Sequence, residues 1–229
     1  MIDTPYHIIL ASNSPRRKEL LGGLDLEYEV RVVPGIEENY PDGLTPEQIP
    51  QYLACQKAQA YTLSVGEMLI TADTVVVLDG EVLGKPADEA EAKAMLAKLC
   101  GKTHTVVTGV ALTTLAKQHA FHVVTEVTFK QFTPLEIDYY VTTYCPLDKA
   151  GAYGIQEWIG FIGVTALKGS FFNVMGLPLQ RIYEEIFKFL VSPNEVRTNP
   201  VLACCDAACQ NGISLVQWLS AALATCNFS

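Results

Sequence analysis

The segment "ILASNSPRRKELL", residues 9–21, places positive charge where a helix is expected to begin. It starts as an apolar strand and ends with helical periodicity, and Arg16, Arg17 and Lys18 stand at the junction. Free amides and aligned peptide dipoles at a helix N-terminus disfavour each cation by about 0.3–1 kcal/mol. The pattern therefore indicates an anion bound nearby.

Two neighbouring residues prepare this helix start for such an anion. Ser14 can cap the helix and Pro15 can occupy its first turn, which leaves backbone amides free. Arg16 and Arg17 add planar donors that suit phosphate oxygens. An ordinary capped surface helix whose arginines pair with carboxylates is the simpler alternative, but the strand–turn–helix setting favours an anion site.

Asp73 interrupts the apolar run "LITADTVVVL". A buried carboxylate without a partner is costly and tends to protonate, so Asp73 requires one. The candidates are a divalent cation, a lysine such as Lys57 or Lys85, or a catalytic water that Asp73 deprotonates. A structural carboxylate hydrogen-bonded at a strand end fits this position equally well.

Two further stretches carry polar side chains that can serve a site. In "PGIEEN", Glu37 and Glu38 can bind a hard cation such as magnesium through oxygen, although a solvated acidic loop explains them more simply. In "PLDKAGAYGIQ", glycines allow the backbone to approach a ligand, and the amide of Gln156 can contact a base edge. A tight turn explains the glycines as well, but it does not explain Lys149 or Gln156.

The composition limits the classes of protein that this chain can belong to. Its 229 residues, 49% of them hydrophobic, can bury a substantial core in one large domain or two small lobes. With 16 Lys and Arg against 25 Asp and Glu, the formal charge of −9 argues against general binding to nucleic acid or anionic membrane. The first apolar run, residues 8–11, is too short for a signal peptide, so we expect a cytoplasmic protein.

Strand-like and helix-like runs alternate up to Leu190, which predicts an α/β fold. Strands are expected at residues 6–11, 26–33, 69–78, 104–114, 120–132 and 161–167, with an Asp79-Gly80 hairpin turn and a short returning strand. Helices are expected from Ser14 to Gly22, from Pro46 to Val65, from Asp88 to Gly101 through a capping box with Glu91, from Thr133, and from near Pro178. The link between strands 104–114 and 120–132 is too short for a crossover, so they pair antiparallel and the sheet is mixed.

The last part of the chain differs in character. We expect a main domain at residues 1–190 and a separate extension at residues 191–229, in which residues 213–226 can form a helix too short to cross a bilayer. That helix is expected to pack on the main body or on a partner. The cysteines Cys55, Cys100 and Cys145 are expected to be buried thiols, and unpaired thiols are favoured over a zinc site for Cys204, Cys205, Cys209 and Cys226.

Several motifs together resemble the Maf family of nucleoside triphosphate pyrophosphatases, relatives in fold of the inosine triphosphate pyrophosphatases. They are "LASNSPRRKELL", "GIEE", "TADTVV", "GEVLGKP", "GKTHTVVTGVAL", "LDKAGAYGIQ" and "VMGLPL", in the family's order over most of residues 6–190. The resemblance implies an inosine triphosphate pyrophosphatase-like fold, in which a mixed twisted sheet is flanked by helices and two lobes surround a cleft.

The resemblance also implies a metal-dependent hydrolase that cleaves the α–β phosphoanhydride of a nucleotide and releases a monophosphate and pyrophosphate. Asp73 matches the family's proton acceptor. The implied substrate-binding positions are Ser14, Arg16, Arg17, Lys57, Thr74, Lys85, Lys149 and Gln156. Glu37, Glu38 and Asp73 are the implied ligands of Mg²⁺ or Mn²⁺.

Within the family, Arg16, Thr74 and Gln156 match the branch that hydrolyses dTTP and UTP. The implied substrate class extends to modified pyrimidine nucleotides. The branch that acts on 7-methyl-GTP carries Gln where this chain has Thr74. Gln156 can present both a donor and an acceptor, as a thymine or uracil edge requires.

Other implications concern assembly and role. The family resemblance suggests a homodimer. The alternative to an enzyme is a nucleotide-binding regulator of septum formation whose catalysis is incidental. One local departure is that relatives often carry Glu before the proline of "TTYCPLDKAG", where this chain has Tyr144 and Cys145.

Overall fold

The computed structural model describes residues 4–190 of the chain. Contacts divide the chain after Tyr183, and the sheet and the cavity discussed below belong to the first unit. Of the second unit, the structure describes only residues 184–190, which continue the last helix. The expected helix at 213–226 and the four tail cysteines lie outside the described residues, and the boundary at residue 190 stays a prediction.

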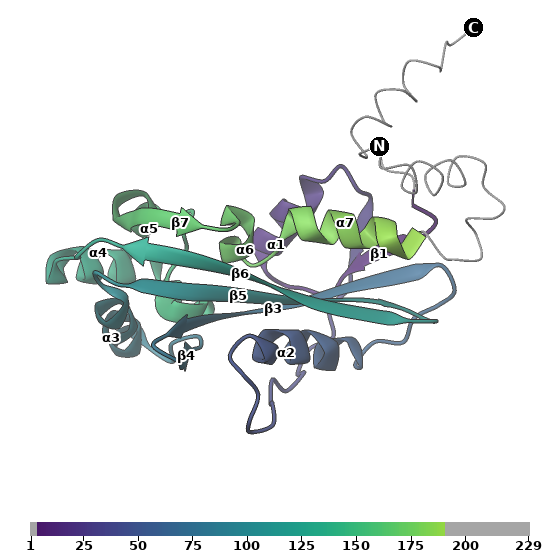
Figure 1. The fold of residues 1–229 in the computed structure, drawn as a ribbon, viewed down its shortest axis with the longest axis horizontal. Coiled ribbons are helices and arrows are strands. Elements are labelled where there is room, and N and C mark those ends of the chain that lie inside the picture. Colours follow the sequence, from purple (N-terminus) through teal and green to yellow (C-terminus); the bar gives the residue numbers. More distant parts are fainter. Residues whose placement is uncertain (1–3, 191–229) are drawn as a thin grey trace, which may run out of the picture. The chain divides into compact units, whose positions relative to one another are not determined.

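A mixed sheet forms the centre of the first unit (Figure 1). Its strands lie in the order β2-β1-β3-β5-β6-β7, and β4 pairs with β3 off this path. They are β1 His7–Leu10, β2 Tyr28–Val30, β3 Glu67–Leu78, β4 Glu81–Leu83, β5 Thr103–Thr114, β6 Gln118–Phe129 and β7 Val164–Lys168. The pairs of β1 with β2 and β3 are parallel and the others antiparallel, so the predicted mixed α/β sheet is confirmed.

Helices flank this sheet. They are α1 Pro15–Gly22, α2 Gln48–Ala58, α3 Glu89–Leu99, α4 Pro134–Tyr144, α5 Trp158–Gly163 and α6 Phe171–Met175. The last helix, α7 Leu179–Leu190, begins in this unit and ends in the second. In Figure 1, α2 lies along one face of β3 and β5, whereas α1 and α6 lie on the opposite side. The largest core cluster joins α3 and α4 to the sheet through buried side chains such as Leu96, Leu99, Val106 and Tyr140. None of the helices within residues 4–190 has the length and apolarity that crossing a membrane requires.

The central strand β3 extends past the end of its parallel neighbour β1. The register pairs Leu10, the last residue of β1, with Ile70, while β3 continues to Leu78 beside β5. On the β1 side, Asp73 therefore lies beyond the last strand pair, and the chain leaving β1 turns into α1. The sheet thus opens a space next to Asp73 at the carboxyl end of β1.

Several local signals act as the sequence predicts. Asp79 and Gly80 both have positive φ, 51° and 85°, as a two-residue hairpin turn requires. The capping box of Thr133 and Glu136 is complete. Asp88 caps α3 by accepting from the Glu91 amide, but the Glu91 carboxylate accepts from Ala87 instead of Asp88, so that box is only half formed.

Several predicted elements are wrong in extent, among them the strand expected at residues 26–33, which covers only Tyr28–Val30, and the strand expected at residues 120–132, which ends at Phe129. The helix expected to reach Val65 ends at Ala58, and Tyr61 instead accepts a hydrogen bond from the Val33 amide. The strand expected at residues 161–167 begins only at Val164, because that residue pairs with Phe129, the last residue of β6, and earlier residues have no strand beside them there. Residues 158–163 form α5 instead.

The described cysteines are free thiols, as expected, but they are less buried than expected. Cys55 and Cys100 are partly exposed, and Cys145 is exposed at the end of α4. Cys145 adopts φ of 44°, the left-handed conformation that ends many helices.

Gly109 provides a test of how closely α2 packs on the sheet. A Cβ atom at Gly109 would lie 2.2 Å from the Gln51 nitrogen and the Pro50 carbonyl carbon, both backbone atoms. We expect Gly109→Ala to lower the free energy of unfolding by about 1–3 kcal/mol, because α2 has to shift. Chemical denaturation measures this change. Gly84→Ala is the matched control, since nothing lies within 4 Å of its added Cβ; equal stability of the two variants would contradict this packing.

Candidate active site

A cavity of about 490 Å³ opens at the carboxyl end of β1, where β3 extends past β1. It collects residues from widely separated parts of the chain: the α1 turn, the loop after β2, the end of α2, the middle of β3 and the loop before α5. The predicted site residues that line it are Ser14, Arg16, Arg17, Glu38, Lys57, Asp73, Thr74, Lys85, Lys149 and Gln156. Glu37 is not among the lining residues, and its carboxylate accepts a hydrogen bond from Asn39 at 3.1 Å.

Lys57 is the partner that the buried Asp73 requires. Its Nζ lies 2.6 Å from Asp73 Oδ1 and 2.9 Å from Glu38 Oε1, so one ammonium group forms ion pairs with two carboxylates. The side chains of Lys57 and Asp73 are only 14% and 12% exposed, which shields their attraction from water. Lys57 stands in the last turn of α2, and the packing of α2 on β3 brings it to Asp73.

The Glu38 carboxylate responds to this cluster of charges. Burial raises its pKa, but the hydrogen bond and charge of Lys57 and the charges of Lys85 and Arg17 outweigh burial, so its pKa lies below the usual value. Glu38 is therefore ionised at neutral pH and adds a second negative charge beside Asp73.

Arg17 is bound to the protein itself. Its Nε donates to the Gly176 carbonyl at 2.8 Å, its Nη1 to the Ala72 carbonyl at 2.8 Å, and its Nη2 to Thr74 Oγ1 at 3.2 Å. Ala72 and Thr74 are the two neighbours of Asp73, so the guanidinium group fixes the strand on both sides of that carboxylate. Burial lowers the pKa of Arg17, although the charge of Asp73 opposes this effect. The alternative that the arginines pair with carboxylates therefore does not describe Arg17, whose donors bind two backbone carbonyls and a hydroxyl.

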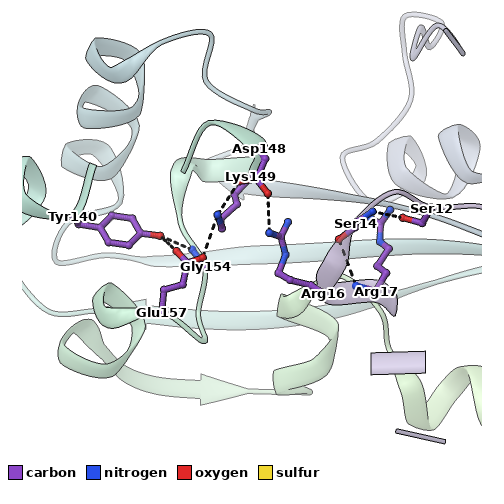
Figure 2. A network of polar contacts seen from close by, with 9 residues as sticks. All are labelled: Ser12, Ser14, Arg16, Arg17, Tyr140, Asp148, Lys149, Gly154 and Glu157. Atoms are coloured by element: carbon purple, nitrogen blue, oxygen red, sulfur yellow. Dashed lines mark hydrogen bonds and ion pairs between the residues drawn. The ribbon is translucent and has the colours of Figure 1, made fainter. Parts of the chain in front are cut away.

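Arg16 points to the other side of the cavity. Its Nη1 donates to Asp148 Oδ2 at 2.9 Å, and its side chain is 22% exposed (Figure 2). Ser14 caps α1 as predicted, because its Oγ accepts from the Arg17 amide at 3.4 Å, with Pro15 in the first turn. Arg16 remains accessible to an anion in the cavity.

The loop before α5 brings a second group of polar side chains. Lys149 Nζ lies 2.7 Å from Asp148 and 3.1 Å from Glu157. Figure 2 shows these three residues together. Gln156 lines the cavity, and its Oε1 is buried without a hydrogen-bond partner in the structure. An unpaired buried carbonyl oxygen is costly, so a donor on a bound ligand would satisfy it.

Thr74 and Lys85 complete the set of predicted residues in the cavity. Thr74 Oγ1 bonds Thr108 Oγ1 at 2.9 Å in addition to Arg17, and this ties β3 to β5. Lys85 follows β4 and brings its charge close enough to Glu38 to lower the pKa of that carboxyl.

A metal ion would find few protein ligands here. Within residues 4–190, no three or more His, Cys, Asp or Glu side chains gather as a metal-binding group. Asp73 and Glu38 nevertheless converge on the single ammonium of Lys57. Magnesium often binds one or two carboxylates together with substrate phosphates, so this donor pair fits a cation shared with a phosphate ligand.

Sequence reasoning missed two residues that shape the site. Glu157 binds Lys149 and also accepts a short hydrogen bond from the Tyr140 hydroxyl, which in turn accepts from the Gly154 amide (Figure 2). Glu157 directly follows Gln156, but nothing in the sequence links it to Tyr140 on another helix.

Comparisons with known proteins identify similar chains. Residues 7–189 match the family described as Maf-like protein. A dTTP/UTP pyrophosphatase of Phocaeicola vulgatus is 63% identical over 185 residues, which cover 80% of this chain and 96% of that protein. Its counterpart of the same name in Bacteroides thetaiotaomicron is 54% identical over 185 residues, with the same coverage of 80% and 96%. A solved nucleoside-triphosphatase / dITP/XTP pyrophosphatase from Mycobacterium abscessus is 18% identical and covers 55% of this chain and 75% of that chain, with a TM-score of 0.37.

Lys57→Met tests the electrostatic link between Lys57 and Glu38. Because Lys57 lowers the pKa of Glu38, we expect the Glu38 carboxyl to titrate at higher pH in the variant, measured by carboxyl ¹³C NMR. In the wild type, the lowered pKa of Glu38 stabilises the folded state at pH values above the ordinary pKa of glutamate. This stabilisation is lost as the pH falls through the lowered pKa. The variant should therefore lose more unfolding free energy at neutral pH than at acid pH.

The control is Lys98→Met, which removes an exposed lysine paired with Glu81 at 2.7 Å. This change should leave the Glu38 titration where it is. An unshifted Glu38 titration in Lys57→Met would contradict the link.

Proposed function

The chain belongs to the Maf-like protein family, and we propose on that premise that it hydrolyses dTTP, UTP and related pyrimidine nucleoside triphosphates at the α–β bond. The products would be a nucleoside monophosphate and pyrophosphate. The main observation that supports this proposal is the composition of one cavity. It is lined by Arg16, Lys57 and Lys85 together with the buried acid Asp73, and by Gln156, whose amide oxygen is unpaired. The relatives' name, dTTP/UTP pyrophosphatase, supports the same activity.

Binding of the triphosphate would exchange ion pairs inside the cavity. Arg16 is paired with Asp148, and Lys57 with Asp73 and Glu38. Phosphate oxygens can take over both cations, because they offer more charge than a single carboxylate. The net charge of the chain is −9, so this attraction is local to the cavity. Ser14 and the first-turn amides of α1 would help to orient the phosphates.

Asp73 would act as the proton acceptor of the reaction. Lys57 Nζ lies 2.6 Å from Asp73 Oδ1, so the ammonium occupies a position at that carboxylate which a water molecule would otherwise take. Once phosphate draws Lys57 away, Asp73 can take a proton from a water molecule. The hydroxide oxygen then bonds to the α-phosphorus, the bond from that phosphorus to the bridging oxygen breaks, and pyrophosphate leaves with the electron pair.

A divalent cation, Mg²⁺ or Mn²⁺, is part of the proposal. Asp73 and Glu38 would hold it together with the phosphates, whereas Glu37 is not a lining residue of the cavity. When bound, such a cation neutralises phosphate charge and polarises the phosphorus–oxygen bonds.

The other end of the cavity would receive the base. Gln156 offers its unpaired carbonyl oxygen to the N3–H of thymine or uracil, while its amide nitrogen can donate to a base carbonyl. Thr74 stands next to Asp73 on β3, and Lys149 lines the same cavity. Modified pyrimidine nucleotides that keep this edge are within the proposed substrate class.

An enzyme is favoured over the nucleotide-binding regulator of septum formation. The relatives are named for catalysis, and simple binding does not require an acid positioned as Asp73 is. Homodimeric assembly and a cytoplasmic location stay predictions of the sequence analysis.

Asp73→Asn tests the proposed proton acceptor. Removing the base should lower pyrophosphate release from dTTP at least about 10²–10⁴-fold, while nucleotide binding stays measurable by calorimetry. Asp79→Asn is the matched control, because the same change in the exposed hairpin turn leaves the cavity intact. Full turnover by Asp73→Asn would refute the role of Asp73.

A paired substitution tests the proposed cation ligands. Glu38→Gln should raise the Mg²⁺ or Mn²⁺ concentration needed for half-maximal pyrophosphate release by about tenfold, since one charged oxygen ligand is lost. Glu37→Gln should leave that concentration unchanged, because Glu37 is not among the lining residues of the cavity. The reverse pattern would show that Glu37 is the ligand.

A further inference from the structure

Tyr140 is a buried residue that the proposed reaction does not use. It lies on α4, is fully buried at 0% exposure, and is not one of the residues that line the cavity. Its hydroxyl nevertheless makes two directed contacts with the loop before α5: it donates to Glu157 Oε2 in a short hydrogen bond and accepts from the Gly154 amide at 3.0 Å. Figure 2 shows the Tyr140 hydroxyl between these two groups.

These contacts fix both sides of Gln156. Gly154 precedes Gln156 by two residues and Glu157 follows it, so a single hydroxyl holds the segment on each side of the cavity-lining amide. The segment is also folded tightly on itself. The Glu157 amide donates to the Gly154 carbonyl at 3.0 Å, and a Cβ atom at Gly154 would lie 2.9 Å from Gln156 Nε2 and 2.7 Å from Glu157 Cδ.

The Glu157 side chain makes these contacts instead of capping α5. It occupies the N-cap position of α5, yet its side chain makes no capping hydrogen bond. The carboxylate instead binds Tyr140 and, at 3.1 Å, Lys149. Burial, followed by the charge and hydrogen bond of Glu157, raises the pKa of Tyr140, so the hydroxyl keeps its proton and remains a donor to Glu157 at neutral pH.

We propose that Tyr140, acting through Glu157 and Gly154, is a positioning residue that sets the nucleobase selectivity of the cavity by fixing the amide of Gln156. This inference rests on the proposed function. A glutamine amide can turn either its oxygen or its nitrogen toward a base. Thymine and uracil present an acceptor where cytosine presents an amino donor, so a fixed amide discriminates between them and a mobile amide accepts both.

The first experiment compares dTTP with CTP in one preparation of enzyme. Tyr140→Phe keeps the buried ring and removes only the hydroxyl. We expect kcat/KM for dTTP to fall, mainly through KM, and the ratio of kcat/KM for dTTP to that for CTP to fall about tenfold, as expected for loss of about 1.4 kcal/mol of discrimination. This ratio does not depend on the folded fraction, so partial unfolding of the variant cannot produce the change.

The matched control is Tyr139→Phe on the same helix. Tyr139 is 48% exposed and packs its ring against Trp158. This variant should keep the wild-type ratio of dTTP to CTP. An unchanged ratio in Tyr140→Phe, or an equal fall in Tyr139→Phe, would overturn the proposal.

A second substitution separates positioning from general structural damage. If Tyr140 acts through Gln156, then Tyr140→Phe should change the ratio no further when Gln156→Ala is already present. Equal falls in both backgrounds would contradict an effect through Gln156.

Binding measurements separate this inference from the proposed function. Calorimetry with dTMP and with pyrophosphate needs no turnover. We expect Tyr140→Phe to weaken dTMP binding about tenfold and to leave pyrophosphate binding unchanged. Failure of the wild type to hydrolyse dTTP would refute the proposed function, whereas unchanged dTMP affinity in Tyr140→Phe would refute the positioning role.

Discussion

The ion pair between Asp73 and Lys57 is the interaction on which the rest of the site depends. Asp73 stands in the middle of a largely apolar central strand, and an unpaired carboxylate there would be costly. A 2.6 Å contact with Lys57 offsets that cost, but only while α2 packs closely enough on β3 and β5 to deliver the lysine. The Asp73–Lys57 ion pair therefore depends on the close approach of α2 at Gly109, as does the packing of the core.

Three cations of the cavity differ in the groups that bind them. Arg17 is fully engaged with the backbone on either side of Asp73 and with the turn at Gly176, so it fixes the acid and has little freedom to follow a substrate. Arg16 and Lys57 are held by carboxylates alone, and these pairs can be exchanged for phosphate. The cavity thus has replaceable contacts where phosphate charge would arrive.

Much of this arrangement could be predicted from the sequence, because the signals are local. Local sequence patterns identify Asp73, which interrupts an apolar strand pattern, as well as the cations at the start of α1 and the capping residue Ser14. Partners that lie far apart in the chain could not be predicted in this way. Backbone carbonyls such as those of Ala72 and Gly176 carry no sequence signal. The predicted start of the strand at 161–167 was wrong because the first residue of β7 depends on where β6 ends.

A crystal structure with a non-hydrolysable dTTP analogue and Mg²⁺ tests the central claim most directly. The proposed arrangement predicts that the phosphates lie between the first turn of α1 and Asp73, with Arg16 and Lys57 bound to phosphate oxygens and the Lys57–Asp73 distance longer than its present 2.6 Å. A nucleotide bound elsewhere, with the pairs of Lys57 to Asp73 and of Arg16 to Asp148 unchanged, would contradict it.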